Sequence, residues 1–280
     1  AGRPALGGCR GLPPQDAAAL LARTLGREAL TGYVQQRFGP GCYSLAHALI
    51  AGLPVREYVT TNYDPLVELA AADLGRPLRV LPFDEATAGD PWLLKLHGDA
   101  AHPDSIVLTR EQYLEFGDHR TALAGVLQSL LLTRHVLFVG TSMLDDDLIR
   151  IAHQVRRVLH RPGESPRRRT GTVLSVQADP VRARLWEQDV ETVAMGGGDV
   201  PTPEAARRLE VLLDLLGCLS SRPIGYLLDP AYRGLLDAEE EELAEALGGV
   251  AEALATGTRH SWAGHEVRRL LVDLGRADAG

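Results

Sequence analysis

The chain has almost no lysine. Of its 29 lysine and arginine residues, only Lys95 is a lysine. A Walker-type phosphate loop needs a Gly-Lys-Ser/Thr segment, so this class of nucleotide-binding site is excluded. Chemistry that proceeds through a lysine Schiff base has Lys95 as its one candidate.

Cysteine and long apolar runs are also scarce. The three cysteines, Cys9, Cys42 and Cys218, form no CxxC pair. They therefore predict neither a zinc site nor a secreted disulfide framework, and a reducing cytoplasm fits them best. No apolar run reaches the roughly 18 to 20 residues of a membrane span, and no signal peptide is evident, so a membrane partner is not expected.

Positive charge is in short supply as well. The formal net charge is -8 and the isoelectric point is near 5.6, so no overall positive field gathers a polyanion and direct binding of nucleic acid is not expected. A length of 280 residues with 45% hydrophobic side chains is enough for one large globular domain or two smaller ones.

What the chain does contain is a series of apolar, strand-like runs, each ending in a small or acidic polar group. Several are separated by helical patterns, at residues 64–74, 118–133 and 145–160. Near-continuously hydrophobic strands alternating with helices predict an α/β fold, a Rossmann-like doubly wound and mainly parallel sheet with helices on both faces. The runs are REYVTTNYD (56–64), RVLPFD (79–84), WLLKLHGD (92–99), HVLFVGTS (135–142) and TVLSVQAD (172–179).

Helical patterns also precede and follow this region, at residues 16–38, 43–50, 204–218, 237–255 and 261–274. The Gly- and Pro-containing segment at 196–203 is typical of a connector. We therefore expect an α/β domain at 1–199 and a helical C-terminal extension at 200–280. The run DAEEEE (237–242) indicates an acidic first helical turn.

In doubly wound sheets, ligands bind beyond the carboxyl ends of the strands. By this rule the polar groups at those ends share one crevice. A simpler interpretation is that several of them cap helices, which is common and contributes about 1 kcal/mol. The candidates are Asn62, Asp64, His97, Gly140, Ser142 and Asp145.

Two of these segments carry groups that could take part in catalysis or ligand binding. His97 can accept a proton near neutral pH, although a lone histidine is more often structural. Gly140 permits a close backbone approach, and Thr141 and Ser142 offer hydroxyls and amides to a ribose or pyrophosphate at a helix N-terminus.

Taken in order, TTNYD, KLHGD, SIVLTREQYLEF (105–116) and LFVGTSMLDDDL resemble the sirtuin-like NAD-consuming domains of bacterial antiphage defence proteins. The resemblance covers roughly residues 43–180. It implies that Asn62 positions a ribose or water, with Thr61 and Asp64 beside it, and that His97 is the general base.

The resemblance also implies the rest of the dinucleotide site. Gly140, Thr141 and Ser142 contact ribose and diphosphate, with Asp145 nearby, and the segment around Gln177 approaches adenine. NAD is then the substrate, and no metal is expected.

The chain departs from the family in two ways. The interval between His97 and Gly140 contains no cysteine, whereas sirtuin deacylases carry a four-cysteine zinc ribbon there. The family's first strand and glycine loop have no good counterpart near Gly11-Leu12-Pro13, so we expect them to be truncated or degenerate.

The resulting hypothesis is an NAD+ glycohydrolase, a cytoplasmic hydrolase that depletes NAD in antiviral defence. Asn62 would hold a water or a ribose hydroxyl in line, and His97 would remove its proton. The alternatives are an NAD-dependent protein deacylase and a non-catalytic module that senses NAD or ADP-ribose. Because an unregulated NAD hydrolase would exhaust the NAD of the cell, we expect its activity to be controlled by homo-oligomerisation or by a fused or associated sensor protein.

Overall fold

The computed structural model describes residues 11–39, 41–119, 121–141, 145–159, 169–220, 224–256 and 261–276, with all side chains there except those of 116–119, 146, 255 and 256. The chain forms two compact units, Ala1–Leu219 and Ser220–Gly280. We expected a division between 1–199 and 200–280. The units divide later because helix α9 (Thr202–Ser220) packs Leu209 and Leu213 into a core of the first unit.

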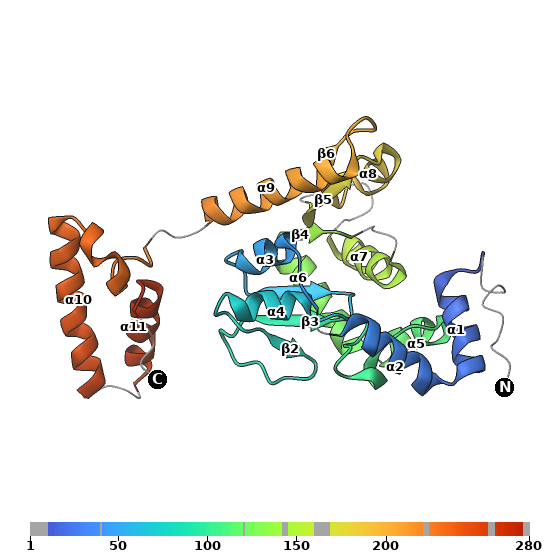
Figure 1. The fold of residues 1–280 in the computed structure, drawn as a ribbon, viewed down its shortest axis with the longest axis horizontal. Coiled ribbons are helices and arrows are strands. Elements are labelled where there is room, and N and C mark those ends of the chain that lie inside the picture. The colour runs from blue at the N-terminus through green and yellow to red at the C-terminus, as the bar shows by residue number, and fades with distance from the viewer. Residues whose placement is uncertain are drawn as a thin grey trace. The chain divides into compact units, whose positions relative to one another are not determined.

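The first unit contains a sheet of three parallel strands with β3 in the middle (Figure 1). Its strands are β1 (Glu57–Thr60), β2 (Arg79–Leu81) and β3 (Trp92–Lys95). Thr60 lies opposite Lys95 in the register. The TTNYD and HGD segments therefore leave the same edge of the sheet from neighbouring strands. Helix α4 (Leu66–Asp73) follows β1.

A second sheet, also of three parallel strands, has β5 in the middle. It consists of β4 (Val136–Val139), β5 (Gly171–Gln177) and β6 (Val190–Gly196), with helices α7 (Asp146–Leu159) and α8 (Pro180–Trp186) between them in the chain. The sequence predicts β4 and β5 but not β6, whose VETVAMG segment lacks a continuous apolar run.

The α/β class with parallel strands flanked by helices is confirmed. The described strands form two sheets rather than one. One apolar cluster joins them: Leu94 and Leu96, at β3, share it with Val173 of β5. Side chains of α7 and of α6 (Thr121–Thr133) complete the cluster. The carboxyl end of β3 is therefore packed against β5 and against helices α6 and α7.

Helices precede β1. They are α1 (Pro14–Leu25), α2 (Arg27–Phe38) and α3 (Leu45–Gly52). The single helix expected at 16–38 is broken at Gly26, whose φ of +86° lies outside the helical region. Within 11–39 and 41–56 the structure contains no strand.

The second unit contains the short 3-10 helix η3 (Pro230–Leu235) and helices α10 (Ala238–Thr256) and α11 (Trp262–Asp273). Asp237 caps α10, because its Oδ1 accepts bonds from the backbone N–H groups of Glu239 and Glu240. The acidic first turn of this helix thus has the structural role that the sequence indicates. None of the described helices combines the length and the apolar character that crossing a membrane requires.

The chain turns sharply after β3 at Gly98. Its φ is +98°, and a Cβ atom there would lie 2.3 Å from the backbone oxygen of Ser105. The returning segment is fixed by a bond from the N–H of Val107 to the carbonyl of His97, 2.9 Å long. Only glycine fits this position without moving backbone.

We expect Gly98→Ala to lower the free energy of unfolding by about 2–5 kcal/mol, since it combines left-handed strain with a backbone clash. The control is Gly125→Ala in α6, where a Cβ would meet nothing within 4 Å. That change should be neutral or stabilise by about 0.5–1 kcal/mol. Denaturant unfolding of both variants measures this, and equal stabilities would contradict the account of the turn.

Candidate active site

His97 lies just past β3 and is almost completely buried, with 2% of its surface exposed. Its Nδ1 lies 3.4 Å from the hydroxyl of Tyr113, on helix α5 (Arg110–His119), and the two rings meet edge to face. Its Nε2 faces two carboxylates, 3.6 Å from Oδ2 of Asp145 and 3.5 Å from Oδ2 of Asp147. The imidazole is thereby oriented from both sides.

The two carboxylates are held at the start of α7. Oδ1 of Asp145 accepts bonds from the backbone N–H groups of Asp147 and Leu148, at 3.1 and 3.0 Å. Asp145 is therefore a helix cap and also faces His97, so the two interpretations of this residue are compatible. Asp147 is buried, and its Oδ1 accepts a 2.8 Å bond from Arg150.

The loop after β1 carries Asn62, the only asparagine of the chain. Its backbone N–H donates to Thr60 Oγ1 at 3.0 Å, and its side chain is exposed. Thr61, beside it, is half-buried. Asp64 has a local role, since its Oδ1 accepts a bond from the N–H of Leu66 at the start of α4.

Lys95 fixes this loop to β3. Its ammonium group is fully buried and donates to the carbonyl of Asp64 at 2.9 Å and to that of Tyr63 at 3.3 Å. It also forms ion pairs with Glu68 at 2.5 Å and with Asp99 at 3.3 Å. Lys95 is thus enclosed, which does not suit the Schiff-base chemistry for which it was the one candidate.

Burial raises the pKa of the Glu68 carboxyl above its ordinary value, and the hydrogen bond and charge of Lys95 oppose this only in part. Burying this ion pair therefore costs free energy of desolvation. Its ammonium also satisfies two backbone carbonyls of the loop, and this is the connection that keeps the loop in place.

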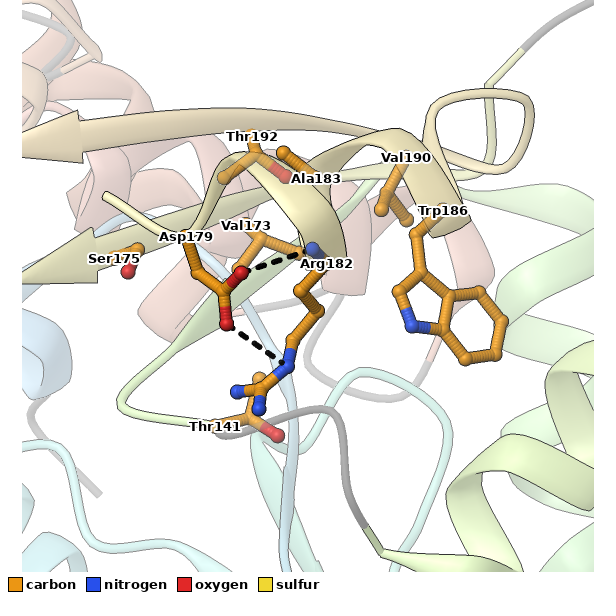
Figure 2. Close-up of a pocket in the computed structure, with 9 residues that line it drawn as sticks. All are labelled: Thr141, Val173, Ser175, Asp179, Arg182, Ala183, Trp186, Val190 and Thr192. Carbon is orange, nitrogen blue, oxygen red and sulfur yellow. Dashed lines mark hydrogen bonds and ion pairs between the residues drawn. The ribbon is translucent and has the colours of Figure 1, made fainter. Parts of the chain in front are cut away.

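The second sheet supplies the Gly140–Thr141 turn. Gly140 has a φ of +71°, so the chain leaves β4 in a left-handed conformation. Thr141 lines a small pocket together with Ser175 on β5 and Asp179 and Arg182 at α8 (Figure 2). Ser142, predicted beside it, lies outside the described residues.

Arg182 is the cation of this pocket. Asp179 orients it, with a bond from the Arg182 backbone N–H to Oδ1 at 2.9 Å and an ion pair from Nε to Oδ2 at 3.5 Å. The guanidinium extends toward Thr141 (Figure 2). The guanidinium thus has the Asp179 carboxylate of the same pocket as its counter-ion.

Gln177 is placed differently from the other candidates. At the end of β5, its side-chain amide donates to the carbonyl of Val200 at 3.0 Å and to Thr202 Oγ1 at 3.4 Å. These bonds fasten the connector to the sheet.

The structure thus brings His97 and Asp145 together, and it places Asn62 and His97 beyond neighbouring strands of one sheet. Thr141 belongs to a separate pocket beside β5. Sequence reasoning missed the roles of Lys95, Tyr113 and Arg182. The one available signal was that the only lysine of the chain lies in an otherwise apolar strand.

Comparison with known proteins places this site in a family. Residues 56–194 match the family described as the SIR2-like domain. This segment is a SIR2-like domain. It contains every site residue predicted above, from Thr61 to Gln177.

Relatives of the SIR2-like domain include two proteins named NAD(+) hydrolase ThsA. The protein of Enterococcus faecium is 34% identical over 119 residues, 40% of this chain and 25% of the relative. That of Bacillus cereus is 32% identical over 121 residues, 41% of this chain and 25% of the relative. Defense-associated sirtuin 2 of Bacillus subtilis is 25% identical over 126 residues, which are 41% of this chain and 12% of the relative. The matches span a quarter or less of these relatives.

We expect Lys95→Met to lower the free energy of unfolding by about 3–5 kcal/mol, because it leaves the buried carboxylates of Glu68 and Asp99 without their cation. The control is Arg134→Met, which removes an exposed ion pair with Glu57 and should have little effect. Thermal and denaturant unfolding compare the two. Similar losses in both variants would show that Lys95 is not a structural anchor.

Proposed function

We propose that the chain cleaves NAD at the nicotinamide–ribose bond, giving nicotinamide and ADP-ribose, and that it depletes NAD in bacterial antiphage defence. The observation that carries the proposal is the placement of His97 within a SIR2-like domain, beyond a central strand and facing two carboxylates. The names of the relatives support both the reaction and the setting.

In the proposed reaction, the oxygen of a water molecule forms a bond to ribose C1′. The bond between C1′ and the nicotinamide nitrogen breaks, and its electron pair neutralises the pyridinium charge. The leaving group therefore needs no acid. The water proton goes to His97, and Asp145 and Asp147 provide a counter-charge for the imidazolium that forms.

Asn62 has the remaining role. Its exposed amide offers both a donor and an acceptor, which suits it to hold a ribose hydroxyl or the attacking water. The Lys95 contacts to the carbonyls of Tyr63 and Asp64 limit where this loop can move. Orientation of this kind contributes a large part of the rate acceleration in such reactions.

We expect both Asn62→Ala and His97→Ala to reduce nicotinamide release from NAD at least about 100-fold, the usual scale for a lost general base. The matched control is His153→Ala, on an exposed position of α7, which should retain activity. Since His97 is buried, the melting temperature of each variant is measured alongside. Wild-type rates in folded Asn62→Ala and His97→Ala proteins would refute the assignment.

A non-catalytic NAD or ADP-ribose sensor is the second candidate, and the enclosure of His97 favours it. Calorimetric binding of NAD without nicotinamide release would support this function over hydrolysis. A protein deacylase has less support, because the His97–Gly140 interval lacks the cysteines of a zinc ribbon. The cytoplasmic location and the oligomeric or sensor partner stay predictions from the sequence.

A further inference from the structure

His97, Asp145 and Asp147 form a cluster with more than one chemical use. Each offers one ligand atom, and the three atoms lie within 4.8 Å of one another. The distances from Nε2 of His97 to the two carboxylates, 3.5 and 3.6 Å, exceed the normal length of an N–H···O hydrogen bond, about 2.7–3.2 Å. The groups thus face one another without the close contact of a fully formed hydrogen bond.

The separations instead match the spacing of ligands around a metal ion. Nitrogen and oxygen ligands bind Zn²⁺ at about 2.0–2.2 Å, which places neighbouring ligand atoms of a tetrahedron roughly 3.4 Å apart. Asp145 is partly exposed, with 22% of its side chain accessible, and so leaves one side of the cluster open for an ion to enter.

A second observation points to a ligand. Oδ2 of Asp147 is buried and has no hydrogen-bond partner among the described residues, although it lies 3.5 Å from His97 Nε2. The side chain of Asp147 is 5% exposed. A buried carboxylate oxygen without a partner is costly, and a cation held in the cluster would satisfy it.

We propose that His97, Asp145 and Asp147 bind a divalent transition-metal cation, of which Zn²⁺ is the representative, and that this cation inhibits the chain. One imidazole nitrogen with two carboxylate oxygens suits Zn²⁺ or Mn²⁺ better than Mg²⁺ or Ca²⁺, which prefer oxygen ligands alone. Arg150 shares the charge of Asp147, so we expect affinity in the micromolar range.

Inhibition follows from competition for one lone pair. Nε2 of His97 cannot hold a cation and accept a proton from water at the same time. Cation binding itself does not depend on the proposed function, whereas the inhibition rests on it.

The binding test uses the full chain, without a polyhistidine tag and stripped of metal by a chelator, titrated calorimetrically with ZnCl₂, MnCl₂ and MgCl₂. We expect one Zn²⁺ site per chain, weaker Mn²⁺ binding and no Mg²⁺ binding. Asp147→Asn and Asp145→Asn should each weaken Zn²⁺ binding at least tenfold. Both substitutions keep the shape of the side chain, and thermal melting verifies folding.

Two controls separate the cluster from surface binding. Asp214→Asn, exposed on α9, and His153→Ala, exposed on α7, should bind Zn²⁺ like the wild type. The proposal is overturned by the absence of saturable Zn²⁺ binding, or by unchanged binding in both cluster variants.

The inhibition test adds Zn²⁺ to the NAD cleavage assay. We expect activity to fall with the same midpoint as calorimetric binding, and to return on adding chelator. Zn²⁺ that binds the cluster but leaves NAD cleavage unchanged would overturn the inhibitory role. A chain that never cleaves NAD would refute the proposed function, while the calorimetry would still decide the cation site.

Discussion

The buried ammonium of Lys95 is the contact on which the arrangement of the first sheet's edge depends. A cation without access to water must be surrounded by negative and dipolar groups, and those available come from three separate segments. They are the carboxylates of Glu68 and Asp99 and the backbone carbonyls of Tyr63 and Asp64. Because one group holds all three segments, the loop bearing Asn62 and the turn after His97 cannot shift independently. The proposed pairing of Asn62 with His97 requires such coupling, because the two residues follow different strands.

Asp145, at the start of helix α7, connects this helix to His97. Asp145 uses one carboxylate oxygen to cap α7 and directs the other at His97. Its position is therefore set by the same backbone N–H groups that begin the helix. The apolar cluster that joins Leu94 to Val173 keeps the two sheets in one core. One residue thus both caps the helix and faces the imidazole.

Much of the fold could be predicted from the sequence, because five of the six strands in the described part of the chain are apolar runs that end in polar groups. The strand β6 was not predicted because VETVAMG is buried only at its two ends and otherwise exposed or half-buried at a sheet edge, so it carries no continuous apolar signal. The break between α1 and α2 at Gly26 was not predicted, because a single glycine is compatible with a continuous helix and the sequence does not reveal its φ. The contact of His97 with Asp147 could not be predicted, since the acidic run at the start of α7 does not reveal which carboxylates are turned toward the histidine. The burial of Lys95 could not be predicted either, since composition alone does not reveal a partner such as Glu68.

The enclosure of His97 has a consequence for how any substrate would be reached. A general base must lie within hydrogen-bond distance of the proton it removes, yet this imidazole is 2% exposed and bordered by Tyr113 and two carboxylates. Of the two carboxylates, Asp145 is the more accessible, with 22% of its side chain exposed against 5% for Asp147, so a small rotation of Asp145 opens the site more readily than a movement of Asp147. Because both carboxylate oxygens move together when the side chain rotates, such a movement would also loosen its cap on α7. Access to the histidine would then be controlled at the start of α7, the helix whose first turn also neighbours the Gly140–Thr141 turn in the chain.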